Sequence, residues 1–269
     1  MPSALRALFV FAHQDDEYAA APWIVEELAA GSAVACVYLT DGGSRSSPAV
    51  RDAESRAALH SLGVTDDRIA FLSDASDRIA DGALAQRCAD GLAMLERWIA
   101  STGFAPQRIY APSYEGGHPD HDAAHVIAAR IAVEHGITDD AWHFSLYNAY
   151  RCRKPFFAAF KQLPTALPSR RASISMQTRI ALTFLCARYR SQRRTWMGLF
   201  PGAVWQRLIA RRESVVRFDL NRLNQRPHEG ELLYERMFGV TFIDFEDSMS
   251  AVGTALGDPE ADAPREVSR

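Results

Sequence analysis

The 269-residue sequence lacks a long apolar run and contains only four cysteines. No stretch approaches the roughly 18 uninterrupted apolar residues that a membrane span needs. The first residues, MPSALRALFVFAH, also lack the apolar segment and small-residue cleavage site of a secretion signal. The cysteines are widely scattered and form no Cys-x-x-Cys pair, which is typical of reduced, mostly buried thiols. We therefore expect a cytoplasmic protein that is neither secreted nor membrane-spanning.

A glycine-rich phosphate loop is missing after the first apolar run. ALFV (7–10) leads into AHQDDE (12–17), and carboxylates in that place would repel a phosphate group. This pattern disfavours a nucleotide-binding α/β protein. The sequence also has no internal repeat and no linker that would divide it into two domains.

Apolar residues make up 48% of the chain, which is enough for the core of one large α/β domain. In the first 150 residues, short apolar runs alternate with longer helical patterns, and such strands pair in parallel through right-handed crossovers. We therefore predict a Rossmann-like, three-layer, mostly parallel sheet with a variable, helical C-terminal part. The expected strands are 7–13, 33–41, 68–72, 108–112 and 142–150, and the expected helices are 17–30, 48–62, 84–101 and 119–135.

The alternation is lost after residue 150. The pattern there predicts helices over 176–197 and 203–212 and late strands over 215–220 and 239–243. We expect one domain over residues 1–269. Its expected parts are an α/β core (1–150), a basic helical part (151–217), a closing segment (218–249) and a flexible tail (250–269).

The basic part, residues 151–217, holds 15 Lys and Arg and one acid, Glu213, although the whole chain carries only −3. The arginines either pair with the acidic remainder of the protein or form a surface for a phosphate-bearing substrate or an anionic bilayer. If the arginines form a surface for a bilayer, the cytoplasmic protein would also make peripheral contact with the inner face of the membrane. Nucleic acid is not expected to bind, because no reader motif accompanies the basic residues.

Two polar clusters follow expected parallel strands, HQDDE (13–17) after the first and HPDH (118–121) after the fourth. Ligands collect at the carboxyl ends of such strands. One imidazole and one carboxylate from the first cluster and one imidazole from the second give the three-ligand set typical of catalytic zinc, with a position open for water. Taken singly, these residues could be loop histidines or carboxylates at helix N-termini, as Glu17 could be.

The motifs AHQDDE (12–17), TDGG (40–43), Arg51 and Glu54 with LG after them, and GGHPDH (116–121) resemble the LmbE-like or PIG-L family. The resemblance is detailed over about residues 5–135 and has weaker signals further on, in YRSQ (189–192) and the late Glu213. It implies a zinc-dependent N-deacetylase. The family acts mostly on N-acetylglucosamine units in small thiols, in antibiotics and in a glycosylphosphatidylinositol lipid precursor.

Position by position, the resemblance implies that His13, Asp16 and His121 hold the metal. Asp15 then matches the general base, which takes a proton from water beside the metal. His118 matches the imidazole that polarises the substrate carbonyl or oxyanion and protonates the leaving amine.

Asp120 would orient His118 or His121, since metal-bound histidines usually need a hydrogen-bond partner. One position departs from the family, which usually has proline where this chain has Gln14. Glutamine at position 14 is compatible with the metal ligands on either side of it, but it changes the rigidity of the loop or its contacts with substrate.

Three further residues have two interpretations each in the sequence. Asp41 could bind sugar hydroxyls or cap a turn with the glycines that follow it. Arg51 could reach a sugar or pair with Glu54 one turn later. His125 lies one turn beyond His121, and its apolar neighbours favour a buried, hydrogen-bonded histidine over a fourth ligand.

The sequence as a whole predicts a zinc hydrolase that removes an N-acetyl, or another short N-acyl, group from a glucosamine-type sugar. The expected partner is an N-acetylated amino sugar, with or without phosphate or lipid. Zn²⁺ is the expected cofactor, and another divalent ion is the alternative, because histidine and carboxylate ligands also accept iron or cobalt. The competing functions are an amidase for a non-sugar N-acyl compound or thiol conjugate, and a catalytically silent protein that binds metal or sugar.

Overall fold

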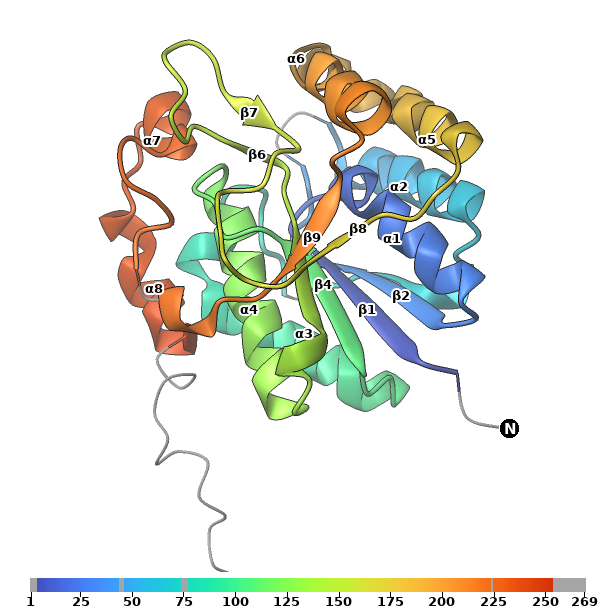
Figure 1. Cartoon of the computed structure of the whole chain (residues 1–269). Coiled ribbons are helices and arrows are strands. Elements are labelled where there is room, and N and C mark those ends of the chain that lie inside the picture. The colour runs from blue at the N-terminus through green and yellow to red at the C-terminus, as the bar shows by residue number, and fades with distance from the viewer. Residues whose placement is uncertain (1–3, 44–45, 74–76, 224, 254–269) are drawn as a thin grey trace, which may run out of the picture.

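The computed structural model describes residues 4–43, 46–73, 77–223 and 225–253. Its centre is a seven-stranded sheet in the order β3-β2-β1-β4-β5-β9-β8 (Figure 1). The first five strands pair in parallel, whereas β9 is antiparallel to both β5 and β8. The strands are β1 (Arg6–Phe11), β2 (Ala33–Tyr38), β3 (Ile69–Phe71), β4 (Arg108–Pro112), β5 (Ala141–Phe144), β8 (Ser169–Arg171) and β9 (Ser214–Arg217). The predicted mostly parallel α/β fold is confirmed.

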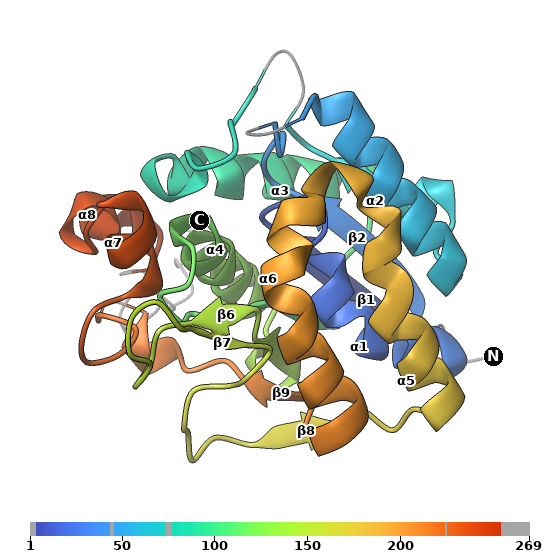
Figure 2. The same cartoon turned by 90° about the horizontal axis from the view of Figure 1, so that it is seen from above.

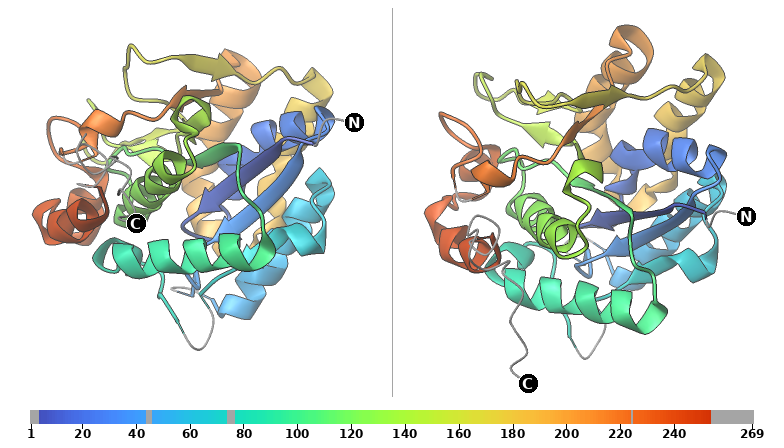
Figure 3. Two further views of the ribbon diagram at one scale, coloured as in Figure 1. Left: turned by 90° about the horizontal axis from the view of Figure 1, so that it is seen from below. Right: turned by 60° about the horizontal axis from the view of Figure 1, so that its bottom comes forward.

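Helices cover both faces of the sheet (Figures 1 and 3). In β1, Phe9 and Phe11 pack with Trp23 on the side of α1, and Leu8 and Val10 pack on the side of α3 and α4. Because both faces of β1 are buried, its sequence is apolar from Ala7 to Phe11 instead of alternating. One layer holds α1 (Glu17–Ala29) and α2 (Pro48–Leu62), and the other holds α3 (Cys88–Thr102), α4 (Pro119–Glu134) and α8 (Ile243–Gly253).

The strand order reverses between β1 and β4. The chain leaves β1 through α1 toward β2, whereas β4 pairs on the opposite side of β1 and continues into α4. At such a switch point the loops after the two strands diverge and leave a crevice at their carboxyl ends. The two polar clusters of the sequence follow these two strands.

The C-terminal part adds a short hairpin and a second helical layer. The hairpin is β6 (Tyr147–Asn148) with β7 (Ala158–Ala159), and α5 (Met176–Thr183) and α6 (Arg193–Val204) lie outside α1 and α2 (Figures 1 and 2). Leu182, Tyr189, Trp196 and Leu199 pack this layer on Tyr18 of α1. A π-helical turn (Trp205–Ala210) follows α6, and α7 (Leu233–Phe238) lies on the other side of the hairpin.

A buried ion-pair group anchors this outer layer. Glu213 accepts hydrogen bonds from the guanidinium groups of Arg179, at 2.9 Å, and Arg207. Arg207 also donates to the carbonyls of Leu182 and Tyr18, at 2.8 and 3.1 Å, so that it ties the π-helical turn to α5 and α1. Two of the basic residues therefore have a structural role, although their partner is the one acid of the basic part and not the acidic remainder of the protein.

Several predicted elements differ from the structure. The helix expected over 176–197 is broken by two 3₁₀ turns (Phe184–Arg188 and Arg190–Gln192), and the helix expected over 203–212 is the π-helical turn. The strand expected over 142–150 divides into β5 and β6, because Leu146 and Tyr147 donate their N–H groups to the buried carboxylate of Glu115.

The strand expected over 239–243 is wrong. Gly239 ends α7 with a φ of 70°, and Thr241 donates its N–H to the carboxylate of Asp244, so that the chain turns directly into α8. That helix reaches Gly253, and the rest of the expected tail lies outside the described residues. Within the described ranges, no helix has both the length and the apolar character needed to cross a membrane.

Candidate metal and catalytic site

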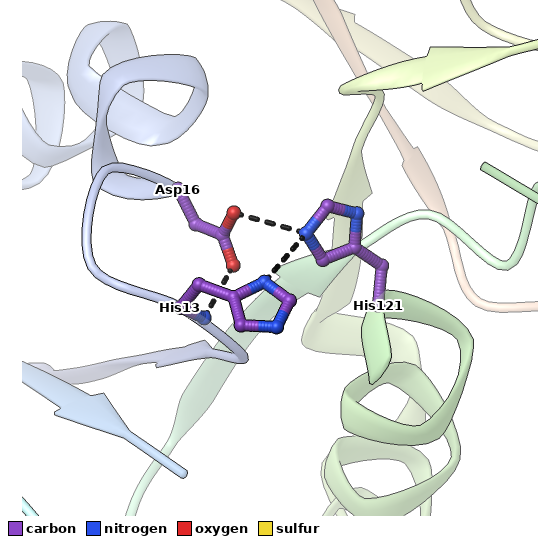
Figure 4. A group of neighbouring side chains, drawn as sticks. All are labelled: His13, Asp16 and His121. Atoms are coloured by element: carbon purple, nitrogen blue, oxygen red, sulfur yellow. Dashed lines mark hydrogen bonds and ion pairs between the residues drawn. The ribbon is translucent and has the colours of Figure 1, made fainter. Parts of the chain in front are cut away.

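The loop after β1 folds back on the carboxylate of Asp16. The backbone N–H groups of Ala12 and His13 donate to Asp16 Oδ2 at 3.0 and 2.9 Å, and all three residues are buried. These bonds satisfy the last N–H groups of the strand end and fix the carboxylate. The other oxygen, Oδ1, is left to face the second cluster (Figure 4).

The loop after β4 approaches the β6 hairpin too closely for a side chain at Gly117. A Cβ atom on Gly117 would lie 1.9 Å from the carbonyl oxygen of Tyr147. Pro119 then opens α4, with His118 as the N-cap residue, whose Nδ1 accepts a hydrogen bond from the N–H of Asp120 at 3.2 Å. His121 therefore lies in the first turn of α4, at the switch point.

The two loops bring His13, Asp16 and His121 together (Figure 4). His13 Nδ1 lies 3.3 Å from His121 Nε2, and Asp16 Oδ1 lies 3.0 Å from the same nitrogen. Ligand atoms around a tetrahedral zinc ion with bonds of about 2.0 to 2.1 Å are themselves about 3.3 Å apart. Two imidazoles and one carboxylate at this spacing fit a divalent metal ion.

A second group of ligand-type atoms, from His13, His118 and Asp120, also lies within 4.8 Å. The carboxylate of this group, Asp120, already accepts hydrogen bonds from other parts of the protein. Asp120 accepts from the N–H groups of Gly82 and Ala85, at 2.7 and 3.2 Å, and contacts His13 Nε2 at 3.0 Å. We therefore regard Asp120 as a support for His13 and the first group as the better metal site.

The role expected for Asp120 is thus corrected. Its side chain holds His13, and only its backbone N–H reaches His118, whereas the sequence predicted contacts to His118 or His121. The reason is geometric: the first turn of α4 directs this carboxylate toward the loop after β1. A carboxylate bonded to the far nitrogen of a histidine fixes the ring and raises its basicity, which suits a metal ligand.

The electrostatics of the cluster favour a cation. Burial alone would lower the pKa of His13, but Asp81, Asp120 and Asp16 outweigh it and raise the pKa to about 10. For Asp16, burial is outweighed by His121 and His13, which hold the pKa of the carboxyl below its usual range. Positive charge at the centre of this group is therefore stabilised by the surrounding carboxylates.

Asp15 lies beside this group in an unusual backbone conformation. Its φ is 101°, which side-chain-bearing residues seldom adopt. The N–H of Asp15 donates to Glu17 Oε2 at 2.9 Å, and its carboxylate accepts from Arg51 at 2.9 Å, so that both ends are held. Burial, only partly offset by Arg51, raises the pKa of Asp15 to about 7. A carboxylate with such a pKa is suited to accept a proton near neutral pH.

His118 is the second imidazole at the edge of the cluster. Its ring centroid is 4.7 Å from that of His13, and both rings border the same pocket. Burial and the charge of His13 lower the pKa of His118 to about 3. The ring is thus neutral in this environment and offers a hydrogen bond to a bound molecule.

The structure decides between the alternatives left open for Asp41 and Arg51. Asp41 caps a turn: it accepts from the N–H groups of Gly43 and Asp81, at 2.9 and 3.1 Å, and does not border the pocket. Its predicted sugar contact is therefore corrected. Arg51 does border the pocket, and Glu54 is not its partner, because Glu54 accepts from Ser191 instead.

Gln14 and His125 lie away from the cluster. Gln14 Nε2 donates to Asp52 on α2 at 2.7 Å, so the departure from the usual proline adds no polar group to the pocket. His125 is buried and its Nδ1 lies 2.8 Å from the carbonyl oxygen of Pro112. It is outside both metal-type groups, as its apolar helix predicts.

A pocket of about 690 Å³ opens above the cluster. One wall is the inner side of α6, and the opposite wall is α7 with the turn after it. The sequence reasoning missed most of the lining side chains, which include Asp81, Tyr147, Phe157, Gln192, Arg194, Trp196, Leu199, Met237 and Phe238. Signals existed for two of them, since Asp81 precedes a glycine after the third strand and Gln192 ends the YRSQ signal.

The YRSQ signal connects the outer layer to the site. Tyr189 OH donates to Glu17 Oε1 at 3.0 Å, and the other oxygen of Glu17 holds the N–H of Asp15. Glu17 is fully buried, so it is more than an exposed carboxylate at a helix N-terminus. Ser191 donates from its N–H and hydroxyl to Glu54, at 2.9 and 2.7 Å. The outer layer thereby fixes the loop that carries Asp15.

Fold and cluster together define an α/β protein with a candidate metal centre at the switch point of its sheet. The model of the PIG-L family, GlcNAc-PI de-N-acetylase, matches residues 8–132, which contain both loops of the cluster. Residues 8–132 thus match the model of this deacetylase family, and the resemblance drawn from the motifs is confirmed. No curated protein matches the chain in sequence.

Solved structures show the same fold. The deacetylase of the teicoplanin biosynthesis pathway gives a TM-score of 0.58 with 17% identity, over 80% of this chain and 99% of that one. A zinc-inhibited form of teicoplanin deacetylase gives 0.55, with the same identity and coverage. N,N'-diacetylchitobiose deacetylase from Pyrococcus horikoshii gives 0.50 with 19% identity, over 90% of this chain and 89% of that one.

Proposed function

We propose that this protein is a divalent-metal-dependent N-deacetylase that removes an N-acetyl, or another short N-acyl, group from a glucosamine-type sugar. The carrying observation is the meeting of His13, Asp16 and His121 beside the held carboxylate of Asp15, at the base of an open pocket. The family match supports deacetylation, and the diacetylchitobiose and teicoplanin deacetylases support a sugar-type substrate.

In this proposal His13, Asp16 and His121 hold the metal ion, and Asp120 keeps the His13 ring in place. When bound, a divalent ion polarises the substrate carbonyl and lowers the pKa of a water molecule to about 7. Zinc is our first choice, because two imidazoles and a carboxylate are a common zinc set. The zinc-inhibited form of teicoplanin deacetylase supports a divalent metal at a site of this kind.

Asp15 accepts the proton of the attacking water, while Arg51 holds its carboxylate in position. His118 donates a hydrogen bond to the carbonyl oxygen as negative charge develops there. When the C–N bond breaks, the proton taken by Asp15 passes to the amine, so that acetate and a free amino sugar leave. Arg51 is occupied with Asp15, Asp81 and the carbonyl of Gly42, so we no longer propose it as a sugar ligand.

The pocket walls favour a sugar that is part of a larger molecule. Phe157, Met237 and Phe238 line the pocket with apolar side chains, and Tyr147 and Trp196 add aromatic rings. Aromatic and apolar groups of this kind stack on sugar faces or cover an apolar attachment. We therefore propose a glycoconjugate or lipid-linked amino sugar over a free monosaccharide.

An acetate-release assay tests the proposed function. Metal-free and zinc-restored protein would be compared on N-acetylated sugars, their conjugates and non-sugar N-acetyl compounds. We expect release from the sugars only with metal. Release only from non-sugar amides would make the protein a different amidase, and metal binding without any release would leave a silent binding protein.

Chelation is expected to remove both activity and part of the stability. Without a cation, the carboxylates around His13 lose their main partner, and a metal that binds only the folded state stabilises it by mass action. Metal content, acetate release and the melting temperature should fall together after chelation and recover together with added Zn²⁺. The protein must be shown to contain metal beforehand. If chelation then leaves its melting temperature unchanged, the proposal of a buried metal site is contradicted.

Replacing Tyr189 with Phe is expected to slow turnover through the position of Asp15. The change removes the hydrogen bond to Glu17, which in turn holds the N–H of Asp15. We expect kcat to fall about tenfold with little change in KM, because a misplaced catalytic group costs rate more than binding, and stability to fall by about 1 kcal/mol. Tyr150→Phe, which removes a hydroxyl away from the site, is the control. Equal effects of the two changes would refute the link.

A further inference from the structure

The outer side of the α5 and α6 layer carries an exposed apolar surface that the proposed function does not use. Among the described residues, eleven large apolar side chains are exposed, and six of them lie here, with exposed fractions of 38% to 72%. We name them the α5–α6 surface: Met176, Ile180, Phe184, Met197, Trp205 and Ile209. Ordinary surfaces expose such side chains singly, so this concentration marks an interaction site.

The spacing of these residues makes two neighbouring stripes. Met176 and Ile180 share one side of α5, and Phe184, four residues further on, follows directly after the end of that helix. Trp205 and Ile209 are four residues apart in the π-helical turn after α6. The first stripe reaches α6, where the rings of Phe184 and Phe200 lie 5.9 Å apart, and α5 contacts the π-helical turn that carries the second stripe. Figures 1 and 2 show α5 and α6 side by side on the outside of the molecule, over α1 and α2.

Unpaired positive charge borders this apolar surface. Arg188, Arg190, Arg193 and Arg194 are exposed, and none forms an ion pair within the described part of the chain. The one acid of the basic part, Glu213, is already buried against Arg179 and Arg207. Arg193 and Arg194 also lie in the first turn of α6, where the helix dipole is itself positive. Like charges gathered in this way call for an anion from outside.

We propose that the α5–α6 surface docks this protein on an anionic lipid bilayer. Helices that lie in the plane of a membrane have this composition, with apolar and aromatic side chains among the headgroups and arginines on lipid phosphates. The residues Arg190 to Thr195 line a hollow of about 550 Å³ that can receive a headgroup. Charge complementarity selects an anionic lipid, because the residues outside the basic part carry a net negative charge.

Docking would also place the active-site pocket near the bilayer. α6 separates the two, since Trp196 and Leu199 face the pocket while Met197 faces outward. Arg194 borders both the pocket and the hollow. The inference goes beyond the proposed deacetylation, because docking needs neither metal nor substrate.

Vesicle sedimentation tests the proposal with the full chain. We expect binding to vesicles of equal parts phosphatidylcholine and phosphatidylglycerol, little binding to phosphatidylcholine alone, and weaker binding at high salt. The emission of Trp205, the one exposed tryptophan among the described residues, should shift to the blue on binding, and Trp205→Phe should remove that shift. Equal binding to both vesicle types, or none, overturns the proposal.

Paired variants separate charge from apolar insertion. Arg190→Glu with Arg193→Glu, and separately Phe184→Ser with Trp205→Ser, should each weaken binding by about tenfold or more. One matched control is Arg87→Glu with Arg97→Glu, at the start of α3 and on α3, across the sheet. The other is Val50→Ser with Ile243→Ser, at apolar side chains that are exposed elsewhere. Controls that lose as much binding would refute the assigned surface.

Two further outcomes are decisive. Self-association without vesicle binding, removed by the Phe184 and Trp205 changes, would assign the surface to a second copy and overturn the lipid proposal. Acetate release from soluble substrates should be unchanged in all these variants, because none of the altered residues borders the catalytic pocket. If the protein releases acetate but does not bind anionic vesicles, only the docking proposal is refuted. If it binds the vesicles but releases no acetate, the docking proposal holds and the proposed deacetylation is refuted.

Discussion

Asp15→Asn is expected to lose nearly all turnover while keeping its metal. Asn has the same shape and can still meet Arg51, but it cannot accept the proton of the attacking water. A positioned acid or base contributes about 100-fold to 10,000-fold, and kcat should fall within that range. The effect should be on kcat and not on KM, because Asp15, at the base of the pocket, acts on the reacting water.

Metal content and kinetics of the Asp15→Asn protein would be measured together. Asp67→Asn, at a largely exposed carboxylate on the surface, makes the same chemical change and should behave like the unaltered protein. If Asp15→Asn remains fully active, another group is the base. If it loses metal instead, Asp15 is a ligand, and the choice of Asp16 is wrong.

His121→Ala is expected to lose the metal itself, and activity with it. Its Nε2 lies within 3.3 Å of both His13 Nδ1 and Asp16 Oδ1, so it is at the centre of the group. We expect metal content well below one per chain and a loss of kcat/KM of at least about 100-fold, beyond the 10-fold to 100-fold of a supporting residue. His60→Ala, at a partly exposed histidine, is the matched control.

Two companion variants separate the two ligand-type groups that meet at His13. His118→Ala should keep the metal but turn over slowly, since His118 is proposed to touch substrate. Asp120→Asn should weaken metal binding by about 10-fold to 100-fold without abolishing it, as expected for a group that holds a ligand in place. Metal loss in His118→Ala with retention in His121→Ala would show that the second group, with His118 and Asp120, is the true site.

The α/β core and the meeting of its two loops could be predicted because both follow from local patterns. Apolar strands such as β1 and β4 are buried on both faces, and their polar residues begin where the strands end. Parallel strands bring those ends to one edge. His13 and His121 lie 108 residues apart, yet this rule alone places them near each other.

Contacts between specific side chains could not be predicted in the same way. Asp120 was expected beside His118 or His121 and instead holds His13. Glu54 was one of two partners considered for Arg51, and it instead accepts from Ser191. Sequence spacing fixes which side of an element a residue occupies. It does not fix which of several neighbouring polar groups forms a hydrogen bond with that residue. The partner is decided by differences in atomic position of about one bond length.

The amino-acid sequence by itself determined the layered sheet, the family and the residues that reach the switch point, since periodicity and strand-end placement are encoded over a few residues. Only the tertiary structure decided how the outer layer completes the site. Tyr189 and Ser191 reach Glu17 and Glu54 across more than 130 residues, and α6 and α7 enclose the pocket. Such long-range packing depends on how whole helices dock, and no local pattern records it.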